Sequence, residues 1–238
     1  MPKITTAKLL TITARDQRIL KALYYYRFMS AMDVTRLLYS QGSLEWVRAR
    51  LSQLAGGDDY STGQYLYRLP LLDGSRGNQE RIFTIGSRGR DFLANELGLP
   101  VTWHYRPSKV KHASYAQILL SLLLTRFLVA SVNWTENNPD YKILEMYTSY
   151  ELGAESKNKR VLPAGRQVIP DAWILFGNKG ARLALIFELD RGREYQKKFK
   201  EHVRSRVHMI RSGEYEKWFG VPGAIIAYAT TGETPEYR

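Results

Sequence analysis

The 238-residue sequence contains no cysteine, which excludes disulfide bonds and thiolate metal sites. The absence fits a reducing compartment, so we expect a cytoplasmic protein. Long hydrophobic runs are lacking too: the longest, Ile118–Leu124, includes Ser121 and falls far short of the roughly 20 residues that a membrane span needs. The first residues lack the apolar segment of a secretion signal. We therefore expect neither membrane insertion nor export.

Acidic residues are scarce relative to basic ones. The sequence has 35 Lys and Arg against 23 Asp and Glu, a formal net charge of +12, and both halves of the chain share the surplus. A basic cytoplasmic protein has a polyanion as its natural partner, and nucleic acid is the commonest one. Basic character that serves only solubility is the alternative. The 44% of hydrophobic residues is sufficient for a buried core.

The first half of the sequence predicts three short helices. Thr13 with Asp16, and Ser30 with Asp33, have the spacing of capping boxes that begin the first two helices. A break at Ser40–Ser43 precedes the third helix, and two helices joined by such a turn form a helix-turn-helix. The residues expected to face the core are Ile19, Leu20, Leu23, Val34, Leu37, Leu38, Leu44, Val47, Leu51 and Leu54.

Two strand-like runs, Gln64–Leu69 and Arg81–Ile85, flank a turn-rich loop at 72–78. This pattern predicts a β-hairpin wing. The segment Thr84–Leu93 resembles the strand-to-helix step that closes many winged-helix domains. We therefore predict an N-terminal winged helix-turn-helix domain over residues 1–100, followed by a linker at 101–110.

Groove geometry makes the third helix the candidate DNA-reading element, because a winged helix places this helix in the major groove. Its predicted outward residues are Ser43, Glu45, Arg48 and Ser52. We expect Arg48 to contact guanine or phosphate, Arg50 to reach a phosphate, and the wing residues Arg76 and Arg81 to follow the backbone. Winged helices also dock proteins, so a protein-interaction scaffold is the alternative function.

Residues 111–238 predict an α/β domain. A long apolar helix ends near Ala130, and a charged helix spans Arg193–Arg211. The predicted strands are Tyr141–Tyr150, Gln167–Phe176, Arg182–Leu189 and Ala224–Ala229. Helices and strands in this order indicate a layered α/β fold, which makes the whole chain an α+β protein.

Carboxylates lie at the ends of two of these strands. Asp171 begins one strand, while Glu188 and Asp190 end the next and share a face by the period of two. Asp171 and Glu188 could together hold Mg²⁺, whose preferred ligands are oxygen atoms. An ion pair is the alternative, with Glu188 bound to a basic residue of the following helix and Asp190 close to Arg191.

Pro170-Asp171 followed by Glu188-Leu189-Asp190 resembles the core of the PD-(D/E)XK nuclease superfamily. Together with the predicted winged helix and the run Phe187–Gly192, the chain resembles the replication-relaxation family of plasmids and other mobile elements. The resemblance implies a restriction-endonuclease-like second domain. It also implies a double-stranded DNA-binding protein acting in replication control or maintenance, with replication or mobile-element proteins as partners.

One departure from the nuclease motif bears on activity. Active members usually carry lysine two residues after the glutamate, where this chain has Asp190. Lys197 or Lys198 on the following helix could replace it. The resemblance thus leaves open a Mg²⁺- or Mn²⁺-dependent endonuclease using Asp171 and Glu188.

The segment Arg193–Arg211 separates into two faces at 100° per residue. The predicted core face comprises Tyr195, Phe199, Val203, Val207 and Ile210. The opposite face is basic and comprises Arg193, Lys197, Lys200, Arg204, His208 and Arg211. A phosphate backbone would relieve the repulsion between these stacked charges, and a solvated surface is the alternative. A homodimer on a palindromic site would fit such a protein, although the sequence shows no interface signature.

Overall fold

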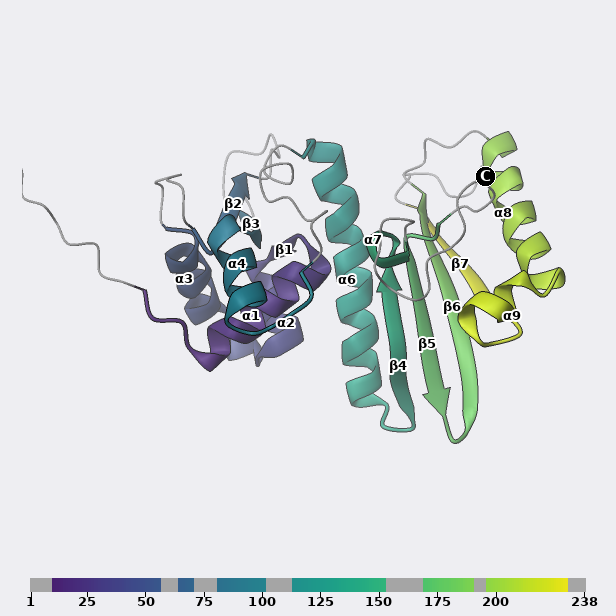
Figure 1. Cartoon of the computed structure of the whole chain (residues 1–238), viewed down its shortest axis with the longest axis horizontal. Helices are drawn as coiled ribbons and strands as arrows, with labels where there is room; N and C mark the ends of the chain where they lie inside the picture. Colours follow the sequence, from purple (N-terminus) through teal and green to yellow (C-terminus); the bar gives the residue numbers. More distant parts are fainter. Residues whose placement is uncertain are drawn as a thin grey trace, which may run out of the picture. The chain divides into compact units, whose positions relative to one another are not determined.

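The computed structural model describes residues 10–56, 64–70, 81–101, 113–152, 169–190 and 196–230. The chain divides into two compact units, Met1–Thr125 and Arg126–Arg238 (Figure 1). The first unit combines helices with a small antiparallel sheet, and the second contains a four-stranded mixed sheet with helices. This combination of helices with an antiparallel and a mixed sheet confirms the predicted α+β class.

The helices of the first unit begin where the sequence predicts. Both capping boxes form. Asp16 accepts hydrogen bonds from the backbone N–H and hydroxyl of Thr13, both at 2.7 Å. Asp33 likewise accepts from the backbone N–H and hydroxyl of Ser30, at 2.9 and 2.8 Å. The elements are α1 (Ala14–Tyr26), α2 (Ala31–Leu38), the 3-10 turn η1 (Gln41–Ser43), α3 (Leu44–Leu54) and α4 (Ser87–Asn95).

The small sheet has the order β1-β3-β2 and is antiparallel throughout. Its strands are β1 (Met29–Ser30), β2 (Leu66–Pro70) and β3 (Arg81–Ile85), so both predicted hairpin strands are confirmed and β1 is an addition. The predicted loop at 72–78 lies outside the described residues, as does the predicted linker except for Val101. Gly89 of α4 lies so close to Tyr65, the residue before β2, that an added Cβ would be 2.2 Å from the Tyr65 carbonyl oxygen.

Most of the predicted core of the first unit is buried. The buried positions are Ile19, Leu20, Leu23, Val34, Val47, Leu51 and Leu54. Leu37, Leu38 and Leu44 are only partly buried. The inner face of α2 is instead centred on Val34 and includes Asp33 and Thr35, because the cap carboxylate and the Thr35 hydroxyl both hydrogen-bond within the helix.

The long helix α6 (Tyr115–Asn137) contributes to both units. In the first, Ile118 and Leu122 pack with Phe28, Leu69 and Ile82. The boundary between the units therefore falls within α6, whereas the sequence placed the start of the second domain at residue 111. By length and composition alone α6 could cross a membrane, and a third (33%) of its most apolar window is buried. A core helix passes the same test.

The second unit contains β4 (Tyr141–Thr148), α7 (Ser149–Leu152), β5 (Ala172–Asn178), β6 (Ala181–Asp190), α8 (Gln196–Arg211), α9 (Glu214–Phe219) and β7 (Ile225–Thr230). The sheet order is β4-β5-β6-β7, antiparallel except for the parallel pair β6–β7. All four predicted strands are therefore present, with their ends shifted by a few residues. The short helices α7 and α9 were not predicted.

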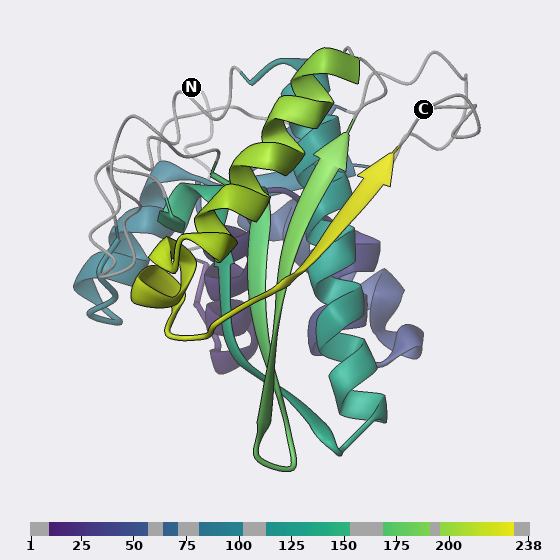
Figure 2. The ribbon, with the colours of Figure 1, turned by 90° about the vertical axis from the view of Figure 1, so that its right-hand side faces the viewer.

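Helices cover both faces of the larger sheet (Figure 2). On one face, α8 and α9 pack over Trp173 and Ile186, with Met209 and Phe219 among the buried residues. On the other, Phe127 of α6 stacks on Phe187 of β6 with ring centroids 3.7 Å apart. Alternate residues of β6 thus point to different helices, which places Glu188, like Ile186, on the side of α8.

Candidate nucleic-acid interface and carboxylate pair

The outward face of α3 is open to solvent within its unit. Glu45 and Arg48 are exposed, as predicted, and form an ion pair one helical turn apart. Ser43 and Ser52 are only partly buried. The face also presents Trp46, a residue that the sequence analysis did not select. These side chains form a mixed polar and aromatic surface on the helix that follows the η1 turn.

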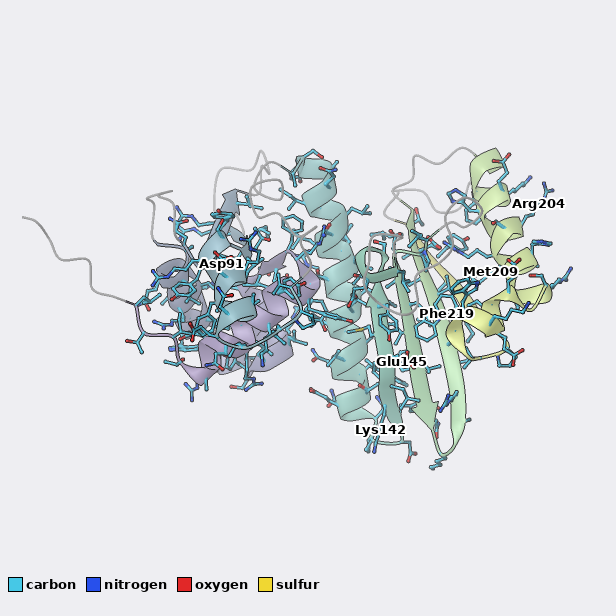
Figure 3. The ribbon with its side chains drawn as sticks, viewed as in Figure 1. Asp91, Lys142, Glu145, Arg204, Met209 and Phe219 are labelled. Atoms are coloured by element: carbon cyan, nitrogen blue, oxygen red, sulfur yellow. The ribbon has the colours of Figure 1, made fainter. Side chains whose placement is uncertain are left out.

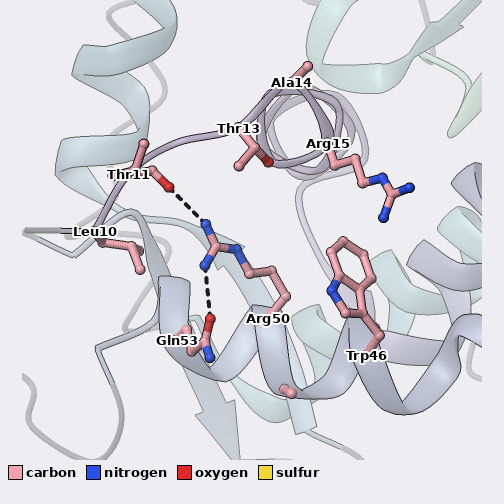
Figure 4. A pocket seen from close by; sticks show the side chains of 9 residues that line it. Leu10, Thr11, Thr13, Ala14, Arg15, Trp46, Arg50 and Gln53 are labelled. Atoms are coloured by element: carbon pink, nitrogen blue, oxygen red, sulfur yellow. Dashed lines mark hydrogen bonds between the residues drawn. The ribbon is translucent and has the colours of Figure 1, made fainter.

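Arg50, which we expect to reach a phosphate, makes four hydrogen bonds within the unit. Its Nε and Nη2 atoms donate to the two carboxylate oxygens of Asp16 at 2.7 and 2.6 Å, and Nη2 also donates to the carbonyl of Thr11 at 2.9 Å. A further bond runs from Nη1 to Gln53 (Figure 4). With every guanidinium nitrogen occupied, Arg50 fastens α3 to the start of α1. These bonds give Arg50 a structural role, and its contact with a phosphate stays a prediction.

Asp16 is fully buried at 0% side-chain exposure, and Arg50 is 16% exposed. Burial by itself raises the pKa of Asp16, but the hydrogen bonds from Arg50 and Thr13 outweigh it, so the pKa lies below its usual value. Sequence reasoning identified Asp16 only as a helix cap. The partner lies 34 residues away, and nothing in the local sequence pattern indicates it.

Aromatic and arginine side chains gather beside α3. Trp46 is 39% exposed and packs edge-to-face on Tyr39 with centroids 5.3 Å apart. The guanidinium of Arg15 lies 5.6 Å from the centroid of the Trp46 ring, and that of Arg18 lies 5.7 Å from the Tyr39 ring. An outward tryptophan on the third predicted helix was the available signal for this cluster, because large exposed aromatics often mark binding surfaces.

A cleft of about 750 Å³ adjoins Trp46. The segment from Leu10 to Arg15 lines one side, and Trp46, Ala49, Arg50 and Gln53 of α3 line the other (Figure 4). Its lining is mixed: Leu10, Ala14 and Ala49 are apolar, while Thr11, Thr13 and Gln53 are polar. Arg50 closes its floor through the bonds described above.

Exposed charge in the described part of the first unit is predominantly positive. The exposed bases are Arg15, Arg18, Lys21, Arg36, Arg48, Arg81 and Arg88, and the exposed acids are Glu45, Asp91 and Glu96. Arg81 is therefore exposed at the start of β3, as a wing contact requires. The other predicted wing residue, Arg76, lies outside the described residues.

In the second unit, Asp171 lies immediately before β5, and Glu188 lies near the end of the neighbouring strand β6. Ala172 of β5 pairs with Phe187 of β6, so the residues just beyond them lie opposite each other at one end of the sheet. The carboxylate of Asp171 accepts a hydrogen bond from the backbone N–H of Leu189 at 2.8 Å. This bond ties the beginning of β5 to the end of β6.

Glu188 forms a buried ion pair with Arg206 of α8, whose Nη2 donates to its Oε1. The side chains are 13% and 2% exposed, respectively. Burial lowers the pKa of Arg206 to about 10, although Tyr228 and Asp171 oppose this effect. The ion-pair alternative for Glu188 is thus confirmed, and its partner Arg206 is a residue that the sequence analysis had not selected.

In the described residues, both carboxylates already have partners other than a divalent cation. A buried guanidinium occupies Glu188 and supplies the positive charge that a metal ion would bring, and the Asp171 carboxylate already binds a backbone N–H. Within the described residues, no group of three or more His, Asp or Glu side chains could hold a metal ion. The side chains of Asp190, Lys197 and Lys198 and the whole of Arg193 fall outside the described parts.

The basic face of α8 is exposed at Lys200, Arg204, His208 and Arg211. Figure 3 shows Arg204 pointing away from the sheet, whereas Met209 points toward it. On the predicted core face, Phe199, Val203, Val207 and Ile210 are only partly buried, although Ile210 packs against the core cluster and Phe199 contacts the ring of Tyr228. The fully buried positions of α8 are Arg206 and Met209, and the predicted Tyr195 lies outside the described residues. Hydrophobicity alone did not select Arg206, which pairs with Glu188.

No family model matches the chain, and neither a curated protein nor a solved structure matches it.

Proposed function

We propose that this protein binds double-stranded DNA through its N-terminal unit, acting as a winged helix-turn-helix domain with α3 in the major groove. Two capped helices, the η1 turn, α3 and the β2–β3 hairpin follow one another in the order that such a domain requires. The resemblance to the replication-relaxation family supports a role in replication control or maintenance of a mobile element.

The observation that carries this proposal is the open, arginine-flanked face of α3. Arg48 lies on that face, while Arg15 and Arg18 extend the positive charge onto α1. The pair between Arg48 and Glu45 is solvent-exposed on both sides, and such pairs contribute only about 0–1 kcal/mol. Arg48 can therefore exchange Glu45 for a guanine or a phosphate at little cost.

In the second unit, the exposed row Lys200, Arg204, His208 and Arg211 gives α8 a surface suited to phosphates. We place this unit in a backbone-holding role. Its restriction-endonuclease-like character stays part of the proposal, supported by the mixed four-stranded sheet and by the position of Asp171 beside Glu188.

The test is duplex binding as a function of salt. We expect the logarithm of the association constant to fall with log[salt] by roughly 0.9 per phosphate contacted. Arg48→Ala should weaken binding to a preferred site by about 1–3 kcal/mol, and Arg204→Ala should weaken all sequences alike and reduce the slope by about one. Lys179→Ala, which removes an exposed lysine at the β5–β6 turn, is the matched control. Binding that does not respond to salt would instead favour a protein-interaction scaffold.

The endonuclease alternative has one supporting observation, the juxtaposition of Asp171 and Glu188. It would require the Glu188–Arg206 pair to open. We expect supercoiled plasmid to stay intact with the protein in Mg²⁺ or Mn²⁺. Nicking that disappears in the Asp171→Ala, Glu188→Ala double variant would establish the enzyme and refute the structural role of the pair.

A further inference from the structure

The cleft beside Trp46 has features that a duplex-reading helix does not need. A helix in the major groove contacts base edges and phosphates with polar side chains, and an intact duplex covers the faces of its bases. Trp46 offers a flat indole ring on the same helix; it is 39% exposed, and Arg15 lies over the ring at 5.6 Å from its centroid. Such a ring is suited to stack on an unpaired base, whose flat face is not covered by neighbouring base pairs.

Neighbouring side chains hold the indole in place. Tyr39 packs against it edge-to-face, and the guanidinium of Arg15 lies within cation–π distance of its ring. Arg18 in turn lies over Tyr39 and donates a hydrogen bond to the carbonyl of Leu38. A ring fixed in this way loses little freedom on binding, so stacking on it retains more of its free energy.

The cleft and its surroundings supply the rest of a nucleotide site. About 750 Å³ is ample for a base with its sugar, and the lining offers apolar contact from Leu10 and Ala49 with polar groups from Thr11 and Gln53. Arg15 on the rim is exposed and can meet a phosphate. Aromatic stacking combined with flanking cations is the general means by which proteins hold single-stranded nucleic acid.

We propose that the Trp46 cleft binds an unpaired nucleobase in a single strand that adjoins the duplex held by α3. This inference rests on the proposed function, since it places the single strand next to the same helix. The protein would then favour a duplex-to-single-strand junction over a blunt duplex.

The experiment compares three labelled probes by fluorescence anisotropy: a blunt duplex, the same duplex with a short single-stranded extension, and the extension strand alone. We expect the extension to tighten binding about tenfold, which at 1.4 kcal/mol per tenfold lies within the range measured for base stacking on an aromatic residue. Trp46→Ala should reduce the ratio of the blunt and extended dissociation constants to about one, and Trp46→Phe should restore most of it. Circular dichroism confirms that each variant is folded.

Trp134→Ala is the matched control, because Trp134 is also exposed (46%) but lies on the part of α6 that belongs to the second unit. It should leave the ratio unchanged. Equal affinity for blunt and extended probes would overturn the inference while leaving the duplex proposal intact. If the single strand bound through Trp46 but the duplex did not bind, the proposed function would be refuted, while the assignment of the Trp46 cleft to an unpaired base would stand. Tight quenching of Trp46 by a free mononucleotide, with no advantage for the extended probe, would assign the cleft to nucleotides and refute the junction.

Discussion

Removing Arg206 tests whether the carboxylate pair of the second unit is structural. Glu188 is only 13% exposed, and Arg206→Ala removes the guanidinium that binds it. Breaking a buried pair by deleting one partner typically costs about 3–5 kcal/mol, because the remaining charge stays desolvated. Domains of this size are stable by only about 5–15 kcal/mol, so the loss should be a large fraction of the total.

Replacing both Glu188 and Arg206 separates the free energy of their ion pair from the cost of burying two charges. Because the pKa of Arg206 is lowered to about 10, holding its charge inside the fold costs free energy at neutral pH, and this cost is relieved only as the pH rises past 10. The double variant Glu188→Gln, Arg206→Met removes both desolvated charges and should therefore be close to the wild type in stability or above it.

Urea unfolding, with hydrogen exchange at the amides of β5 and β6, measures these changes within the second unit. Lys179→Ala is the control, because its pair with Asp140 at 3.2 Å is solvent-exposed and should contribute no more than about 1 kcal/mol. The reasoning is refuted if Arg206→Ala costs as little as Lys179→Ala. If Arg206→Ala instead gained affinity for Mg²⁺ without losing stability, Asp171 and Glu188 would be assigned to cation binding.

Two further predictions concern the first unit. Because the pKa of Asp16 is lowered in the folded protein, the unfolded chain binds the proton more readily, so the free energy of unfolding falls as the pH drops below 3.8. Asp16→Asn should make this fall smaller and should also lower the stability at neutral pH. Measuring the free energy of unfolding across an acid titration tests both effects. Gly89→Ala would place a methyl group 2.2 Å from the carbonyl oxygen of Tyr65 and should cost about 1–3 kcal/mol in thermal or urea unfolding. Gly42→Ala, where an added Cβ meets nothing within 4 Å, should be nearly neutral, and an equal loss at both glycines would contradict the packing argument.

The sequence predicted those elements whose determinants are local. The Thr13–Asp16 and Ser30–Asp33 boxes set the starts of α1 and α2 because each bond spans three residues. The four larger strands of the second unit follow from alternating or continuous apolar runs, and their register brings Asp171 beside Glu188.

Interactions between distant residues were predicted only in part. The ion pair of Glu188 with the following helix was one of two alternatives, but its partner Arg206 was not selected, and Arg50 was assigned to a phosphate contact, since a pattern of hydrophobicity treats arginine as outward. Arg50 is held by the buried carboxylate of Asp16 and Arg206 by the partly buried carboxylate of Glu188, 34 and 18 residues away in the sequence. Only the tertiary fold brings these partners together, so the role of an arginine cannot be assigned before the residues around it in the structure are known.

The dual role of Asp16 gives the first unit an unusual kind of cooperativity. A single carboxylate accepts the N-cap hydrogen bonds of α1 and both donors of Arg50 on α3. Protonating or displacing it would therefore fray one helix and release the other in the same event. The presentation of α3 to a ligand is in this way tied to the integrity of the N-terminal end of α1.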